Sequence, residues 1–101
     1  MLVELDEGYM NRAEVKIDAE DATYLGQWSG TRRHGQGCQV WDDSSRYEGY
    51  WAHGEHNGHG RMIYADGSCY VGYWVDNERS GLGKLIRADQ TKYEGSWLND
   101  Q

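Results

Sequence analysis

Proline and phenylalanine are both absent from this 101-residue chain, and cysteine occurs only twice. Without proline, no residue removes a backbone N–H from a strand, so nothing interrupts strand pairing. In place of phenylalanine the chain has five tryptophans and eight tyrosines. These rings carry a polar group and suit positions that stay half exposed on a sheet of one layer. Two cysteines, Cys38 and Cys69, are too few for the disulfide framework of a small secreted domain, so we expect free thiols.

The chain also lacks a long apolar run and an excess of basic residues. No stretch approaches the ~20 apolar residues of a membrane span, and the first residues do not form a secretory signal. We therefore expect a single small domain located in the cytoplasm. The formal net charge is −7, which gives little attraction for nucleic acid or for anionic lipid. The one adjacent basic pair, Arg32 and Arg33, is interpreted as solvated turn residues.

A motif of the form Tyr-x-Gly-x-Trp returns every 23 residues. Its four copies are residues 24–28, 47–51, 70–74 and 93–97. A second motif, Gly-x-Gly, keeps the same spacing and occupies residues 35–37, 58–60 and 81–83. A fixed period without insertions indicates one supersecondary unit stacked several times along a line.

The residues within one period predict a β-hairpin. In the first motif the tyrosine, glycine and tryptophan alternate with other residues, so they share one face of an extended segment. The second segment alternates as well, and Asp66-Gly67 between the segments is a strong hairpin-turn signal. The pairs Asp43-Ser44 and Asp89-Gln90 are weaker versions of that turn. We expect strands of roughly five residues, joined into one elongated antiparallel sheet.

Glycine weakens a strand, so its regular placement needs a physical reason. We expect Gly26, Gly49, Gly72 and their equivalents to leave room for the large rings of neighbouring strands. We expect the second strand of each hairpin to begin at Gly37, Gly60 or Gly83.

Taken together, these phase-locked motifs resemble the MORN repeat (membrane occupation and recognition nexus). The best copy is residues 47–69, and the resemblance covers residues 24–101 as repeats 24–46, 47–69, 70–92 and the partial repeat 93–101. It implies an all-β fold, an elongated single-layer antiparallel sheet of tandem hairpins. Arg87 departs from the pattern, because it stands where the other repeats have Trp41 and Tyr64.

Residues 1–23 hold seven of the seventeen acidic residues and do not show the repeat clearly. Counting back one period places residues 1–5 opposite residues 24–28, and residues 15–17 opposite residues 38–40. One interpretation is a degenerate repeat that caps the array. The alternative is an acidic linker with a short strand at residues 14–18. The partial fourth repeat favours a fragment of a longer protein.

No motif predicts catalysis, a metal or a cofactor. His53, His56 and His59 are close in sequence, and histidines three apart can ligate zinc. A structural zinc site normally needs four ligands of fixed geometry, so solvated turn residues are the preferred interpretation. The serines have no base placed beside them by a recurring motif. The Gly-x-Gly motif lacks the Lys-Ser/Thr of a phosphate-binding loop.

The sequence therefore favours a non-catalytic protein-interaction scaffold that docks a peptide or helix along an aromatic groove. The candidate partner-binding residues are Tyr24, Trp28, Tyr47, Trp51, Met62, Tyr64, Tyr70 and Trp74. A possible homodimer would form through the C-terminal repeat, at Tyr93 and Trp97, whose open strand edge can pair with another copy. Proteins that resemble this one use such arrays as docking modules in cytoskeletal and ciliary assemblies, or attached to kinases and methyltransferases. The alternative is a lipid-associating regulatory module of a larger enzyme, such as a phosphoinositide kinase.

Overall fold

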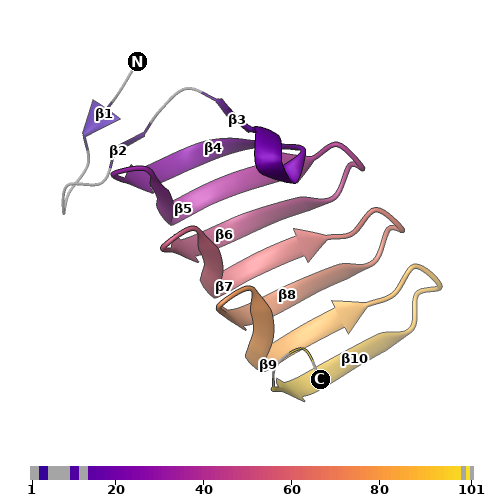
Figure 1. The fold of residues 1–101 in the computed structure, drawn as a ribbon. Coiled ribbons are helices and arrows are strands. Elements are labelled where there is room, and N and C mark those ends of the chain that lie inside the picture. Colours follow the sequence, from indigo (N-terminus) through magenta and orange to yellow (C-terminus); the bar gives the residue numbers. More distant parts are fainter. Residues whose placement is uncertain (1–2, 5–9, 12–13, 99, 101) are drawn as a thin grey trace.

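The computed structural model of the chain describes residues 3–4, 10–11, 14–98 and 100. Ten strands form one antiparallel sheet in the order β1-β2-β4-β5-β6-β7-β8-β9-β10, with β3 also paired to β4 (Figure 1). The strands are β1 Val3–Glu4, β2 Met10–Asn11, β3 Val15–Ile17, β4 Ala22–Ser29, β5 Arg32–Trp41, β6 Arg46–Ala52, β7 Glu55–Ile63, β8 Cys69–Val75, β9 Glu78–Ile86 and β10 Lys92–Trp97. The described residues contain no α-helix, only the 3₁₀ turn η2 at Asp18–Glu20. The predicted all-β sheet of tandem hairpins is confirmed.

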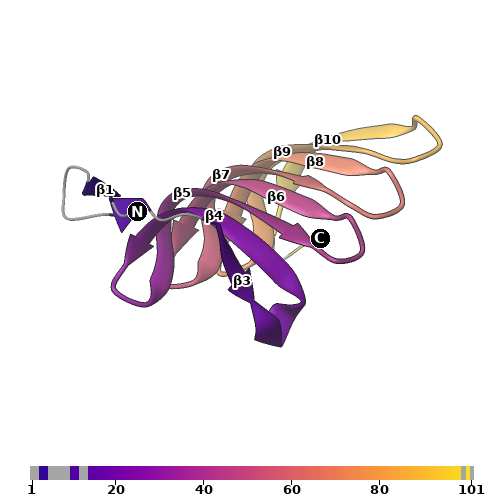
Figure 2. The same cartoon turned by 90° about the horizontal axis from the view of Figure 1, so that it is seen from above.

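The strands are longer than the predicted five residues, because each hairpin contains a bulge. In the second repeat Gly49 pairs with Gly60, but Trp51 pairs with His56. Three residues of β7 therefore lie opposite the single residue Tyr50 of β6. The other two complete repeats have the same irregularity. Bulges bend the strand that carries them, and Figure 2 shows the sheet as an arch with β3 tucked beneath it.

The bulge corrects the predicted start of the second strand and separates the roles of the two Gly-x-Gly glycines. The second strand begins five residues before Gly37, Gly60 or Gly83, not at the glycine. The first glycine of the motif, such as Gly58 with φ of 96°, lies within the bulge in a backbone region that favours glycine. The second lies under a tyrosine ring, since a Cβ on Gly60 would be 2.2 Å from the Tyr47 hydroxyl oxygen. The predicted crowding by a ring of the neighbouring strand is therefore confirmed for Gly60 and its equivalents. A Cβ on Gly49 would instead meet backbone atoms of β7 first, so the obstacle there is the close approach of the two strands.

The core is a row of edge-to-face rings on one side of the sheet, called here the inner face. Tyr47 contacts Trp51 of its own repeat with ring centroids 5.2 Å apart, and Trp74 of the next repeat at 5.5 Å. The Trp51 indole N–H also donates a hydrogen bond to the carbonyl of Gly37 in the preceding repeat, at 3.1 Å. Each tyrosine of the three complete repeats is therefore covered by two tryptophans. Tyr93 has only Trp97 of its own repeat as a ring partner in the described chain and is 43% exposed.

Residues 15–20 pack on the inner face at the N-terminal end of the array. β3 pairs with β4, but in a register one residue away from the one that the 23-residue period implies: Val15 lies opposite Tyr24. A shift of one residue turns every side chain of a strand to the other face. Val15 and Ile17 consequently pack against the aromatic core. The short strand expected at residues 14–18 is present as β3. Of residues 1–5, whose alignment with residues 24–28 was expected, Met1, Leu2 and Leu5 lie outside the described residues.

The turns that lack glycine keep the same conformation as Asp66-Gly67. Gly67 has φ of 92°, and its equivalents Ser44 and Gln90 have φ of 78° and 75°. In each turn the aspartate carboxylate accepts hydrogen bonds from the backbone N–H and the hydroxyl of the residue two positions on, such as Ser68 after Asp66. The recurring Asp-x-Ser/Thr therefore holds the turn where glycine is missing.

Candidate interaction surface

The six predicted partner-binding rings of the repeat motif are brought together, but they are buried. Tyr24, Tyr47 and Tyr70 have no exposed surface, and Trp51 is 3% exposed. The expectation that these rings stay half exposed is therefore wrong for this chain. Burial also raises the pKa of Tyr47, so its hydroxyl stays protonated and donates to the carbonyl of Tyr50 at 2.8 Å. Whether a partner reaches these residues stays a prediction.

The remaining predicted residues are more accessible. Met62 and Tyr64 pack against the margin of the core and are only partly buried. Tyr93 and Trp97 lie on β10, the last strand of the sheet, whose outer edge is unpaired among the described strands. Their participation in self-association stays a prediction.

Sequence analysis missed a second ladder on the inner face. Arg33, His56 and Arg79 occupy the same position of successive repeats and insert between the rings. The Arg33 guanidinium lies 4.9 Å from the centre of the Trp51 ring, and that of Arg79 lies 4.4 Å from the centre of Trp97. Such cation–π contacts stabilise the array beyond simple burial. The signal was available, because these three residues recur with the period of 23.

His56 is the neutral member of this ladder and is buried, not solvated as predicted. Its imidazole stacks on Tyr47 at 3.8 Å and meets the edge of Trp74 at 5.2 Å. Burial, helped by the positive charge of Arg33, lowers the pKa of His56 to about 4. Its Nδ1 atom is buried and has no hydrogen-bond partner among the described residues. An uncharged ring therefore fills a slot that the neighbouring repeats fill with a guanidinium.

The two ends of the ladder are closed by acidic side chains from the same chain. Arg33, also predicted to be solvated, donates to the Glu20 carboxylate at 2.8 Å and to the carbonyl of Gly54 at 3.1 Å. The hydrogen bond from Arg33 lowers the pKa of Glu20. At the other end Arg79 donates to Asp100 at 3.0 Å. Both ends of the inner face are therefore already occupied by intramolecular ion pairs.

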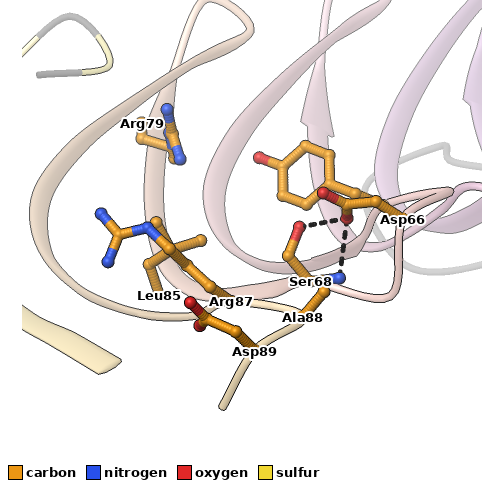
Figure 3. Close-up of a pocket in the computed structure, with 8 residues that line it drawn as sticks. Asp66, Ser68, Arg79, Leu85, Arg87, Ala88 and Asp89 are labelled. Carbon is orange, nitrogen blue, oxygen red and sulfur yellow. Dashed lines mark hydrogen bonds between the residues drawn. The ribbon is translucent and has the colours of Figure 1, made fainter. Parts of the chain in front are cut away.

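Between these ends the inner face has a hollow of about 510 Å³ at the junction of the second and third repeats. Tyr64 and Leu85 supply its apolar lining. Arg79 and Arg87 lie on one side and Asp66 with Ser68 on the other (Figure 3). Arg87 is exposed. The hollow combines an aromatic ring, an aliphatic side chain, guanidinium groups and the carboxylates of Asp66 and Asp89.

The three histidines that raised the question of a metal point in different directions. His56 is buried on the inner face, whereas His53 and His59 are exposed. Within the described part of the chain no three His, Cys, Asp or Glu side chains gather as a metal site would need. Cys38 and Cys69 lie on β5 and β8 as free thiols.

Comparison with known protein families identifies the family of this chain. The family described as MORN repeat matches four consecutive stretches, residues 24–46, 47–69, 70–92 and 93–101. The chain belongs to the MORN repeat family. No curated protein matches it. MORN repeats are modules usually involved in interaction with proteins or membranes. Across the described residues, no helix has the length and apolar character needed to cross a membrane.

Proposed function

We propose that this MORN array is a non-catalytic scaffold that docks a peptide or helix of a protein partner on its inner face. The observation that carries the proposal is the open hollow beside Tyr64, Leu85 and Arg87. Tyrosine and arginine are enriched among the residues that dominate binding energy at protein interfaces. The buried rings of the repeat motif then act as the rigid floor that holds this lining in place.

The geometry favours an occupant that is apolar with an acidic residue. Tyr64 and Leu85 offer apolar surface, and the exposed Arg87 can pair with a carboxylate of the partner. The Asp66 carboxylate already accepts two hydrogen bonds from Ser68, which lower its pKa. It is thus engaged within its own turn. An amphipathic helix presents this combination on one face, as does an extended peptide with alternating side chains.

The proposal includes a cytoplasmic location, with cytoskeletal or ciliary assemblies as the kind of setting in which proteins resembling this one work. The alternative, a lipid-associating module of a larger enzyme such as a phosphoinositide kinase, has less support. The net charge of −7 opposes binding to anionic vesicles.

Affinity capture with the immobilised chain, followed by calorimetry with the captured protein, tests the proposal. We expect Arg87→Ala and Tyr64→Ala to weaken binding about tenfold or more, while Tyr50→Ala on the opposite face leaves it unchanged. Loss of binding in Tyr50→Ala alone would place the partner on the other face. Salt-dependent sedimentation with phosphatidylserine vesicles, without any captured protein, would support the lipid alternative instead.

A further inference from the structure

The face opposite the aromatic core, called here the outer face, carries two hollows built from equivalent residues. The larger, about 530 Å³, lies over β8, β9 and β10, and the smaller, about 350 Å³, lies over β4, β5 and β6. Every residue of the smaller hollow has its counterpart two repeats later in the larger one: Leu25 corresponds to Val71, Gln36 to Leu82, and Glu48 to Glu94. The same positions of the repeat therefore line both hollows.

Both hollows lie along a row of glycines that crosses the sheet at right angles to the strands. Seven glycines are paired in register from β4 to β10: Gly26, Gly37, Gly49, Gly60, Gly72, Gly83 and Gly95. The residues on either side of each glycine point outward and form two walls. One wall contains Tyr50 and Tyr73, which are 45% and 51% exposed, and Leu82, which is 67% exposed. We call this feature the outer trough.

The spacing of the outer trough points to one kind of occupant. Two strands make one repeat, so equivalent wall residues recur about every 9.6 Å. A polyproline II helix advances about 9.3 Å per turn of three residues, so it would present the same face at every repeat. We propose that the outer trough binds a proline-rich segment in the polyproline II conformation, laid across the strands.

Other regular peptides fit the spacing less well. An α-helix repeats its face about every 10.5 Å, over seven residues at 1.5 Å each, and drifts by about 2 Å over two repeats. An extended strand repeats its face about every 6.6 Å, so its side chains no longer match the wall residues after one repeat of the array. A polyproline II helix drifts by only about 0.6 Å over the same two repeats. The register of the trough therefore discriminates against both alternatives.

The chemistry of the trough also suits proline. Exposed tyrosine rings are the surfaces on which proline-rich segments dock, and their hydroxyls can donate to the backbone carbonyls of the peptide. Tyr50 is held in place by Gln36, whose side-chain amide donates to its hydroxyl oxygen at 2.9 Å. Tyr73 is packed edge to face on His59 at 5.3 Å. Both rings are thus positioned before a ligand arrives.

The charges along the trough are compensated within the protein, which matches an uncharged occupant. Glu48 pairs with Arg46 at 2.9 Å and with Arg61. Lys84 approaches Glu94 at 4.0 Å. A strongly charged peptide would have to compete with these pairs, whereas proline would not. The net charge of −7 further disfavours acidic segments.

The test is a titration of the isotope-labelled chain with a decaproline peptide, followed by NMR. Because the hollows lie two repeats apart, about six residues of polyproline II separate them and about ten span both. We expect saturable shifts at the backbone amides of Tyr73 and Gly83, and binding at least fivefold weaker for pentaproline. The double variant Tyr50→Ala, Tyr73→Ala should lose the shifts. Val75→Ala, on the same face but outside the trough, should keep them.

Three results would overturn the proposal: no saturable shift with decaproline at millimolar concentration, equal binding of a ten-residue Gly-Ser peptide, or shifts confined to Leu85 and Arg87 on the inner face. The variants used here leave the inner hollow unchanged. Failure of this proposal is therefore distinguishable from failure of partner binding at the inner face.

Discussion

Replacing Gly72 by alanine should destabilise the array, although alanine normally stabilises a strand relative to glycine. A Cβ at position 72 would lie 2.5 Å from the Gly83 Cα atom, 2.6 Å from the Tyr70 hydroxyl oxygen and 2.7 Å from the Leu82 carbonyl oxygen. Two of these neighbours are backbone atoms of β9. The two strands would have to move apart by about 1 Å to restore ordinary van der Waals distances to the added Cβ. Overpacking of this kind costs about 1–3 kcal/mol, against a gain of about 0.5–1 kcal/mol from removing glycine.

Gly95 provides a matched control at the same position of the fourth repeat. The three atoms nearest to its added Cβ would all belong to Tyr93, with the hydroxyl oxygen at 3.0 Å, and that ring is exposed enough to move. We expect Gly95→Ala to be neutral or slightly stabilising, and Gly72→Ala to lose about 1–2 kcal/mol. For a domain of this size the loss lowers the unfolding midpoint by roughly 4–16 °C. Thermal unfolding followed by circular dichroism measures both. Equal midpoints for the two variants would refute the steric explanation of the glycine row.

Two further predictions concern protonation and the sheet edge. The folded pKa of His56 is about 4, below its unfolded value of about 6.5, so the unfolded state binds the proton first and stability falls as pH drops from about 6.5 towards 4. We expect the free energy of unfolding, measured with urea, to fall by about 2 kcal/mol between pH 7 and pH 5. The same dependence of stability on pH in the His56→Gln variant would contradict this assignment. Because no described strand pairs with the outer edge of β10 and Tyr93 is exposed, we expect the chain to dimerise through this strand and a version ending at Lys92 to be monomeric. Analytical ultracentrifugation distinguishes the two, and a wild-type chain that stays monomeric would disprove it.

The period of the sequence was sufficient to predict the faces of the sheet. Tyr47, Gly49 and Trp51 alternate within one strand, and alternation decides which side chains share a face whatever the partner strand does. The common face of the Tyr and Trp rings, the steric role of the glycines and the tandem hairpins all follow from that local rule. The full burial of the tyrosine rings could not be predicted in this way, because burial depends on how tightly adjacent repeats pack. Tryptophans from two repeats cover each tyrosine.

Features that depend on the bulge or on register could not be predicted from composition. The polar stretch around His56 is typical of a turn, yet the bulge lengthens β7 and turns the imidazole into the core. The shift of β3 by one residue is likewise invisible to an alignment at 23 residues, although it decides that Val15 and Ile17 face inward. The inner hollow arises where Arg87 replaces an aromatic residue, a departure that the sequence shows but whose spatial result it does not.

The contact between each tyrosine and the tryptophan of the following repeat means that the repeating unit of sequence is not the smallest self-sufficient piece of the protein. A fragment cut at residues 24–46 would strip Trp51 from Tyr24, whose rings lie 5.3 Å apart, and would leave a core tyrosine facing water. A fragment that extends to residue 52 keeps Trp51 over Tyr24. Fragments of this array should therefore end after a strand that carries a tryptophan, not just before a tyrosine. Each fragment that folds on its own then includes one strand of the following repeat.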